Sequence, residues 1–151
     1  GPRLRPGPAP LIVYADTSAL VKLVLLESSS AEMTALQSVA TVLASAATAS
    51  AGLRTALAAA YRDRRLPQLD LATAKRLLER GWAATSRLSI DPALIQEAGP
   101  LAEQEGLRGY DAVHLAALIR LGSPDVVDRF ACWESELRTA ARDRSCQLFP
   151  I

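Results

Sequence analysis

Apolar residues form the first regular pattern along the chain. Residues 11–15 (LIVYA) are a continuous apolar run with two β-branched members, which is typical of a strand buried on both faces of a parallel sheet. The run ends at Asp16, and Thr17 and Ser18 then offer caps for a helix that extends to about Glu27. The pattern predicts a strand followed by a helix, which is the first unit of an α/β fold.

The same periodicities predict the later elements. Further helices are expected at about residues 31–43, 53–64 and 71–85, from 91 onward with a kink or split at 99–100, and at 110–120 and 135–144. Further strands are expected at 47–50, 88–90, 126–127 continuing over 129–133, and 147–151. In the helix over 71–85, a single buried stripe is expected from Ala74, Leu77, Leu78 and Trp82. The order predicts a three-layer α/β/α fold with a mostly parallel central sheet.

The length of the chain sets the number of domains. A chain of 151 residues fits one ordinary domain, which buries about two-thirds of its unfolded surface without disulfides or a structural metal. The first ten residues, GPRLRPGPAP, hold four of the nine prolines, and the leading Gly-Pro resembles the remnant of a cleaved expression tag. We therefore expect residues 1–10 to be disordered or tag-derived and residues 11–151 to form a single domain.

Cysteine content and hydropathy bear on the compartment. Cys132 and Cys146 are too few to cross-link a fold, and no second Cys/His group lies near them for zinc. The most signal-like stretch, residues 11–26, is interrupted by Asp16 and Lys22, and no apolar run reaches the roughly 18 to 20 residues of a membrane span. We expect a cytoplasmic protein with no membrane partner.

Three acidic residues stand where an α/β sheet usually places its site. Asp16 ends the first strand, Glu134 follows the strand through residue 133, and Asp111 lies in the first turn of a helix, where the helix dipole favours its ionised form. Carboxylates that converge repel one another unless a cation neutralises them, and hard oxygen ligands suit Mg²⁺ or Mn²⁺. Taken singly, however, an Asp before Thr-Ser is most often a turn or cap residue, and an Asp in the first turn of a helix is favourable without any function.

A resemblance to a known family joins these residues. The segments VYADTSALVK (residues 13–22), LRGYDAVHLA (107–116) and FACWESEL (130–137) resemble, in order, three motifs of PIN domains, especially VapC-type toxins of bacterial toxin–antitoxin pairs. The resemblance covers residues 11–151 and implies a PIN-like fold and a Mg²⁺-dependent endoribonuclease, with Mn²⁺ as a further possible metal. It implies that Asp16 and Asp111 bind the metal, that Glu134 completes the catalytic set, and that the partners are RNA, a small antitoxin and a second copy of the chain.

The sequence departs from that family at two places. The helix that normally starts with a metal-binding Glu reads AGLRTAL (residues 51–57) here, so Gly52 stands at the acidic position. At the third motif Glu134 replaces the usual Asp, and Cys132 the usual Thr. We expect reduced or lost activity, with Gly52 either an introduced inactivating change or a natural loss. This leaves open a silent module that binds antitoxin or RNA without turnover. A phosphoacceptor or haloacid-dehalogenase-type protein is less favoured, because the second Asp of that motif is missing.

Other polar and aromatic residues carry weaker signals. We expect His114 to be a packed, hydrogen-bonded residue rather than a catalytic one. Ser18 fits both a helix cap and a support for Asp16, and Lys22 fits both a solvated residue and a contact to substrate phosphate. Core or partner-facing roles are expected for Trp82 and Trp133, and a helix-terminal role for Glu27.

The formal net charge of +1 conceals two oppositely charged regions. Residues 54–87 carry eight Lys or Arg against three acidic residues, whereas residues 91–111 carry five acidic residues against Arg108 alone. The small net charge excludes a histone-like polycation and a highly charged disordered chain. The basic region is compatible with an RNA backbone, and also with an ordinary solvated helix face.

Overall fold

Strand β1 (Ile12–Ala15) lies at the centre of the sheet in this computed structural model, which describes residues 7, 9–66 and 68–151. The five strands of that sheet run parallel in the order β3-β2-β1-β4-β5. The other strands are β2 (Val42–Ala46), β3 (Ser86–Leu88), β4 (Arg129–Ala131) and β5 (Leu148–Phe149). The predicted three-layer α/β/α fold is confirmed, and the sheet is parallel throughout its described strands.

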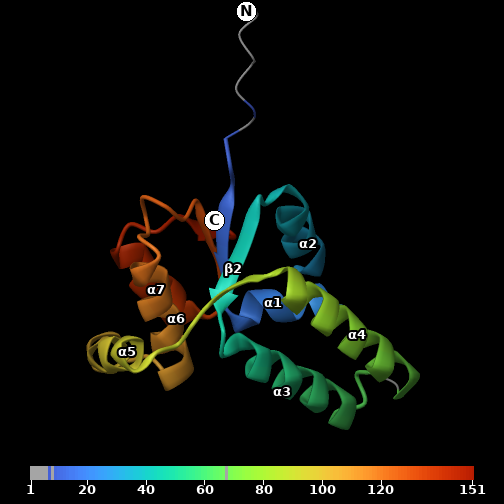
Figure 1. The fold of residues 1–151 in the computed structure, drawn as a ribbon. Coiled ribbons are helices and arrows are strands. Elements are labelled where there is room, and N and C mark those ends of the chain that lie inside the picture. Colours follow the sequence, from blue (N-terminus) through green and yellow to red (C-terminus); the bar gives the residue numbers. More distant parts are fainter. Residues whose placement is uncertain (1–6, 8, 67) are drawn as a thin grey trace, which may run out of the picture.

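Helices cover both faces of the sheet (Figure 1). The helices are α1 (Thr17–Val24), α2 (Ser30–Val39), α3 (Ala49–Arg62), α4 (Gln68–Ala84), α5 (Pro92–Glu105), α6 (Gly109–Arg120) and α7 (Ser135–Asp143). Helices α1 to α4 contribute to one hydrophobic cluster and α5 to α7 to the other. In β1, Val13 and Ala15 belong to the first cluster and Tyr14 to the second, because successive strand residues point to opposite faces.

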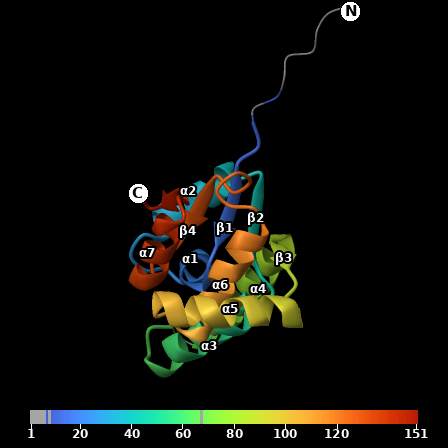
Figure 2. The same cartoon turned by 90° about the vertical axis from the view of Figure 1, so that its left-hand side faces the viewer.

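The strand order places the site. Beginning at β1, the chain adds β2 and β3 on one side and later β4 and β5 on the other, so the order reverses between β1 and β4. A crevice opens beyond the carboxyl ends of parallel strands at such a reversal. Asp16 directly follows β1, and Glu134 lies three residues beyond the end of β4. Figure 2 shows β1 and β4 side by side, with α6 and α7 near them.

Two predicted strands were misplaced. Residues 47–50 are not a strand, because β2 occupies Val42–Ala46 and the helix α3 already begins at Ala49. The helix expected over 31–43 accordingly ends at Val39. Only Val42 of β2 is a strand-favouring residue, and the leucine and alanines that follow favour a helix, so local propensity is overridden by pairing with β1. Strand β3 lies two residues earlier than predicted.

The helix predictions need further corrections. Helix α1 ends at Val24 rather than near Glu27, and α4 begins at Gln68 rather than residue 71. Helix α5 continues through Pro100 without a split; Gly99 before it has no Cβ to clash with the proline ring. Leu77 is 47% exposed and is not part of the buried stripe, which contains Ala74 and Leu78.

Three further expectations concern the termini, the cysteines and the membrane. Most of residues 1–10 lie outside the described residues, so the prediction for that segment stays a prediction. Both Cys132 and Cys146 are buried free thiols. Within residues 7, 9–66 and 68–151, no helix has the length and hydrophobicity to cross a membrane.

Candidate functional site

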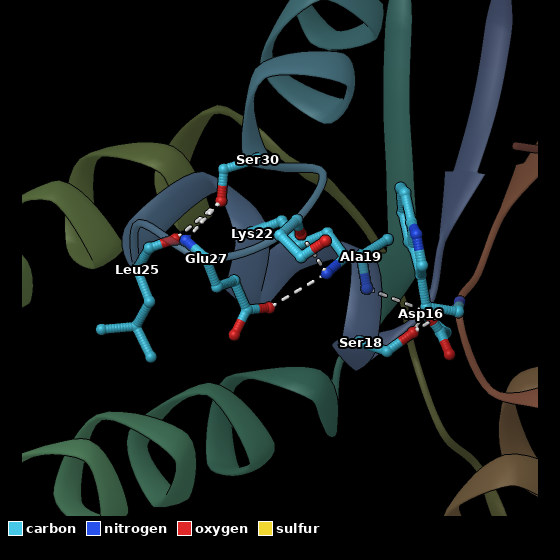
Figure 3. Close-up of polar contacts among 9 residues, drawn as sticks. Asp16, Ser18, Ala19, Lys22, Leu25, Glu27 and Ser30 are labelled. Atoms are coloured by element: carbon cyan, nitrogen blue, oxygen red, sulfur yellow. Dashed lines mark hydrogen bonds and ion pairs between the residues drawn. The ribbon is translucent and has the colours of Figure 1, made fainter. Parts of the chain in front are cut away.

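Asp16 is held by three donors at the end of β1. Its Oδ1 accepts hydrogen bonds from Ser18 Oγ at 2.7 Å and from the backbone N–H of Ala19 at 3.0 Å, and its Oδ2 accepts one from Cys132 Sγ at 3.1 Å. Figure 3 shows the first two bonds at the start of α1. Asp16 is therefore the N-cap of α1, a role that we had predicted for Thr17 or Ser18.

Ser18 takes the second of its two predicted roles. Its hydroxyl donates to Asp16 and accepts the backbone N–H of Trp133 at 2.9 Å. This bond ties the start of α1 to the segment after β4. Ser18 thus fixes the carboxylate of Asp16 relative to the segment that carries Glu134.

Burial changes the acidity of Asp16. Its side chain is 1% exposed, and this desolvation raises the pKa of the carboxyl to about 6. The negative charge of Asp111 raises the pKa further, while the bonds from Ser18, Cys132 and Ala19 lower it. The group is ionised at neutral pH but bears an unfavourable desolvation, which a bound cation would offset.

Asp111 and Glu134 complete the acidic set. Asp111 lies in the first turn of α6, and its pKa is raised by partial burial and then by the charge of Glu134, against a lowering effect of Arg108. Glu134 is the N-cap residue of α7, but its side chain makes no capping bond and is exposed. The predicted residues Asp16, Asp111 and Glu134 thus line the same cavity.

A cavity of about 410 Å³ contains these residues. Its lining consists of Asp16, Thr17, Ser18, Val21, Ala51, Gly52, Thr55, Tyr110, Asp111, His114 and Glu134. No three His, Cys, Asp or Glu side chains in the described part of the chain are grouped to hold a metal. Mg²⁺ is commonly bound by one or two carboxylates while keeping several waters. The donor set therefore fits a hydrated Mg²⁺ on Asp16 and Asp111, and not an all-protein cage.

On the α3 side of the cavity, Gly52 lies beside the side chain of Thr17. A Cβ built on Gly52 would lie 2.7 Å from Thr17 Cγ2, closer than real Cβ atoms approach, and 3.2 Å from Thr17 Oγ1, which is a tight contact. Thr17 is in turn held by a hydrogen bond of 3.1 Å between its hydroxyl and His114 Nε2. A larger residue at position 52 therefore requires the Thr17 side chain to shift or turn.

His114 is a packed residue, as predicted. It is 1% exposed, and Tyr14 OH lies 2.8 Å from its Nδ1 while Thr17 lies next to its Nε2. Burial lowers the pKa of the imidazole to about 4, so the ring is neutral at pH 7, with one nitrogen donating and the other accepting. Its role is to hold Tyr14 and Thr17 in place.

Lys22 fits neither role predicted for it. Its side chain is only 9% exposed, and its Nζ donates to Glu27 Oε1 at 3.2 Å and to the backbone carbonyl of Ser28 at 2.7 Å (Figure 3). The ammonium also lies 4.8 Å from the ring centroid of Trp133. Glu27, expected to end a helix, lies beyond α1 and pairs with Lys22 instead.

Two site contacts escaped the sequence analysis. The thiol of Cys132 bonds to Asp16, and burial raises the pKa of that thiol, so it stays a protonated donor. A signal was present, because Cys132 and Glu134 are separated by one residue after a buried strand. The contact between Thr17 and Gly52 joins residues 35 positions apart, and no local pattern reports it.

The parallel sheet and the acidic cavity at the reversal of its strand order agree with the PIN-like domain that the sequence motifs imply. Comparison with known proteins agrees, although no family model matches the chain. It is 40% identical over 139 residues to Ribonuclease VapC45 and to Ribonuclease VapC49 of Mycobacterium tuberculosis (strains CDC 1551 / Oshkosh and H37Rv, respectively), covering 92% of this chain and 95% of each relative. The chain belongs to the VapC ribonuclease family.

A solved structure supports the fold. The crystal structure of PAE2754 from Pyrobaculum aerophilum superposes with a TM-score of 0.62 at 21% identity, covering 87% of both chains. At this identity the likeness extends to the fold alone.

Proposed function

We propose that this protein is the toxin of a toxin–antitoxin pair, a Mg²⁺-dependent endoribonuclease whose turnover is reduced by Gly52. The observation that carries the proposal is the buried Asp16 carboxylate, bonded by three protein donors and facing the same cavity as Asp111 and Glu134. An ion pair does not account for this costly burial, because no Lys or Arg in the described residues pairs with Asp16. The names of the two mycobacterial relatives support the activity.

The residues of the cavity have different roles in this proposal. Asp16 and Asp111 would hold Mg²⁺, which supplies activation of water and neutralisation of charge on the phosphodiester. Ser18 and Cys132 keep the Asp16 carboxylate in one orientation, so it needs little reorganisation on binding. Glu134, exposed and free of a capping bond, can accept a proton or a water hydrogen bond at the cavity mouth.

A second candidate is a silent module that binds RNA or antitoxin without turnover. It is supported by the occupied position beside Gly52, since the α3 wall contributes no carboxylate. For both candidates, the family suggests a small antitoxin and a second copy of the chain as partners.

RNA cleavage with a matched pair of variants tests the proposal. Mixed cellular RNA would be incubated with purified protein in Mg²⁺, Mn²⁺ or EDTA. We expect slow cleavage that is lost in EDTA and in Asp111→Asn, while Asp125→Asn, an exposed residue outside the cavity lining, behaves as the unaltered protein. Cleavage that persists in Asp111→Asn at the rate of the unaltered protein would contradict the assignment of Asp111 to the metal site. RNA binding without cleavage in every condition would favour the silent module.

A further inference from the structure

A second groove lies between α3 and α4. Its volume is about 330 Å³, and its lining consists of Arg54, Leu57, Ala58, Tyr61, Arg62, Leu71, Lys75 and Leu78. The floor is apolar, because Leu57 and Leu78 are buried, whereas all three cationic side chains are exposed. An acidic side chain is missing from this lining, although α4 carries Asp70 and Glu79. We call it the α3–α4 groove.

Helix α3 connects this groove to the carboxylate cavity. Ala51 and Thr55 line the cavity, and Ala58 and Arg62 line the groove. These four residues have the spacing i, i+4, i+7 and i+11, which places them on one stripe of a helix. All four are exposed, and the stripe spans about 16 Å at 1.5 Å per residue. An extended strand that enters the cavity can therefore follow α3 into the groove.

The cations of the groove are available to a ligand. Within the described residues, neither Arg62 nor Lys75 takes part in an ion pair. Arg54 lies 4.0 Å from Glu79, but both side chains are more than 60% exposed, so the pair is weak. Tyr61 adds a 39% exposed aromatic ring beside these charges. Cations with an exposed aromatic ring are the combination that binds single-stranded nucleic acid.

We propose that the α3–α4 groove binds the single-stranded RNA segment next to the phosphodiester in the carboxylate cavity. Arg62 and Lys75 contact phosphates, and Tyr61 stacks on a base. The inference rests on the proposed function for the identity of the ligand. RNA fits better than an acidic peptide, because a phosphate backbone supplies a regular charge along the full stripe and a base supplies a flat partner for the tyrosine ring.

The test measures binding in EDTA, so that it does not depend on cleavage. Fluorescence anisotropy with a labelled single-stranded RNA would compare the unaltered protein with Arg62→Ala/Lys75→Ala. The control is Arg129→Ala/Arg142→Ala, which removes the same charge from a separate cavity beside β5. Loss of two phosphate contacts should weaken binding about 25-fold at 0.1 M salt and reduce the salt slope by about 1.4. The control should keep the slope and most of the affinity.

Variants of Tyr61 test the proposed base stacking independently of the charges. Tyr61→Ala should weaken RNA binding about fivefold or more, and Tyr61→Phe should not, because stacking uses the ring and not the hydroxyl. Circular dichroism and thermal melting check that each variant is folded. If Arg62→Ala/Lys75→Ala loses no more affinity than the control, the proposal is overturned.

Two further outcomes separate this inference from the proposed function. If the double variant loses binding to a poly-glutamate probe but not to RNA, the groove serves an acidic peptide and the proposal is wrong. If RNA binds through the groove but no metal condition yields cleavage, the groove assignment holds and the nuclease proposal fails. If RNA is cleaved equally well by the double variant, the nuclease proposal holds and the groove assignment fails.

Discussion

The two walls of the carboxylate cavity are built in opposite ways. On the sheet side, Asp16 is buried and bonded by Ser18 and Ala19 of α1 and by Cys132, the residue after β4, so the acidic group is fixed before any ligand arrives. On the α3 side, Gly52 supplies no functional group, and the methyl of Thr17 fills the place beside it. The difference teaches that any side chain at position 52 has to displace the Thr17 methyl. Introducing an acidic residue there therefore means removing a contact as well as adding a charge.

Restoring the α3 carboxylate should have the largest effect. Gly52→Glu alone must push aside Thr17 Cγ2, which is 2.7 Å from the new Cβ, whereas Gly52→Glu/Thr17→Ser removes that methyl and keeps the hydroxyl near His114. We expect the double variant to raise Mg²⁺-dependent RNA cleavage roughly tenfold or more, and Gly52→Glu alone to give less.

The matched control for that experiment is Gly52→Gln/Thr17→Ser, which has the same shape without the charge. A gain that is equal in the Gln and Glu variants would show that the carboxylate is not the cause. No gain in either would mean that the α3 wall does not limit the reaction.

The sheet-side wall should govern the pH dependence of stability. The folded pKa of Asp16 is about 6, above its ordinary value of 3.8, so the folded state holds this proton more tightly than the unfolded state. As the pH rises from 4 to 6 in EDTA, the free energy of unfolding should therefore decrease, by on the order of 3 kcal/mol from this group. Urea denaturation of Asp16→Asn should lack this decrease.

Asp125→Asn serves as the control, since it changes an exposed aspartate and should retain the slope of the unaltered protein. If the free energy of unfolding depends on pH equally in the unaltered protein and in Asp16→Asn, the raised pKa assigned to Asp16 is contradicted.

The smallest expected effect is on stability, in alanine variants of two helical glycines. Gly81→Ala in α4 meets no atom within 4 Å and should stabilise the fold by up to about 1 kcal/mol. Gly52→Ala meets Thr17 and should instead destabilise it by roughly 1 kcal/mol, because overpacking exceeds the gain in helix propensity. Thermal and urea unfolding would measure both, and Thr17→Ser should rescue Gly52→Ala. A stabilised Gly52→Ala would mean that Thr17 turns at little cost.

Sequence reasoning reached the acidic residues because they follow from local rules. Asp16 comes directly after a continuous apolar strand and Asp111 opens a helix, so both could be placed without tertiary information. The parallel pairing of β1 and β4 then explains why Asp16 lies near the segment of Glu134, whereas the position of Asp111 depends on how α6 packs. The three motifs, read as a family resemblance, gave the same site.

Errors arose where tertiary contacts override local preference. Strand β2 is rich in alanine, and its pairing with β1 and the buried bond from Ser45 Oγ to Ala15 O, at 2.6 Å, hold it in place. Neither the strand pairing nor this hydrogen bond can be predicted from the local sequence. Lys22 likewise resembles a surface lysine by composition, and only the turn after α1 brings Glu27 and Ser28 to its ammonium.

The indole of Trp133, next to the ammonium of Lys22, is an internal fluorophore near the cavity. A cation 4.8 Å from the centroid of the Trp133 ring perturbs the electronic environment of that indole. The backbone of Trp133 is bonded to Ser18, which is bonded to Asp16, so the fluorophore is two hydrogen bonds away from the carboxylate. We therefore expect emission from this one tryptophan, isolated by Trp82→Phe, to change when a ligand enters the cavity, without any attached dye.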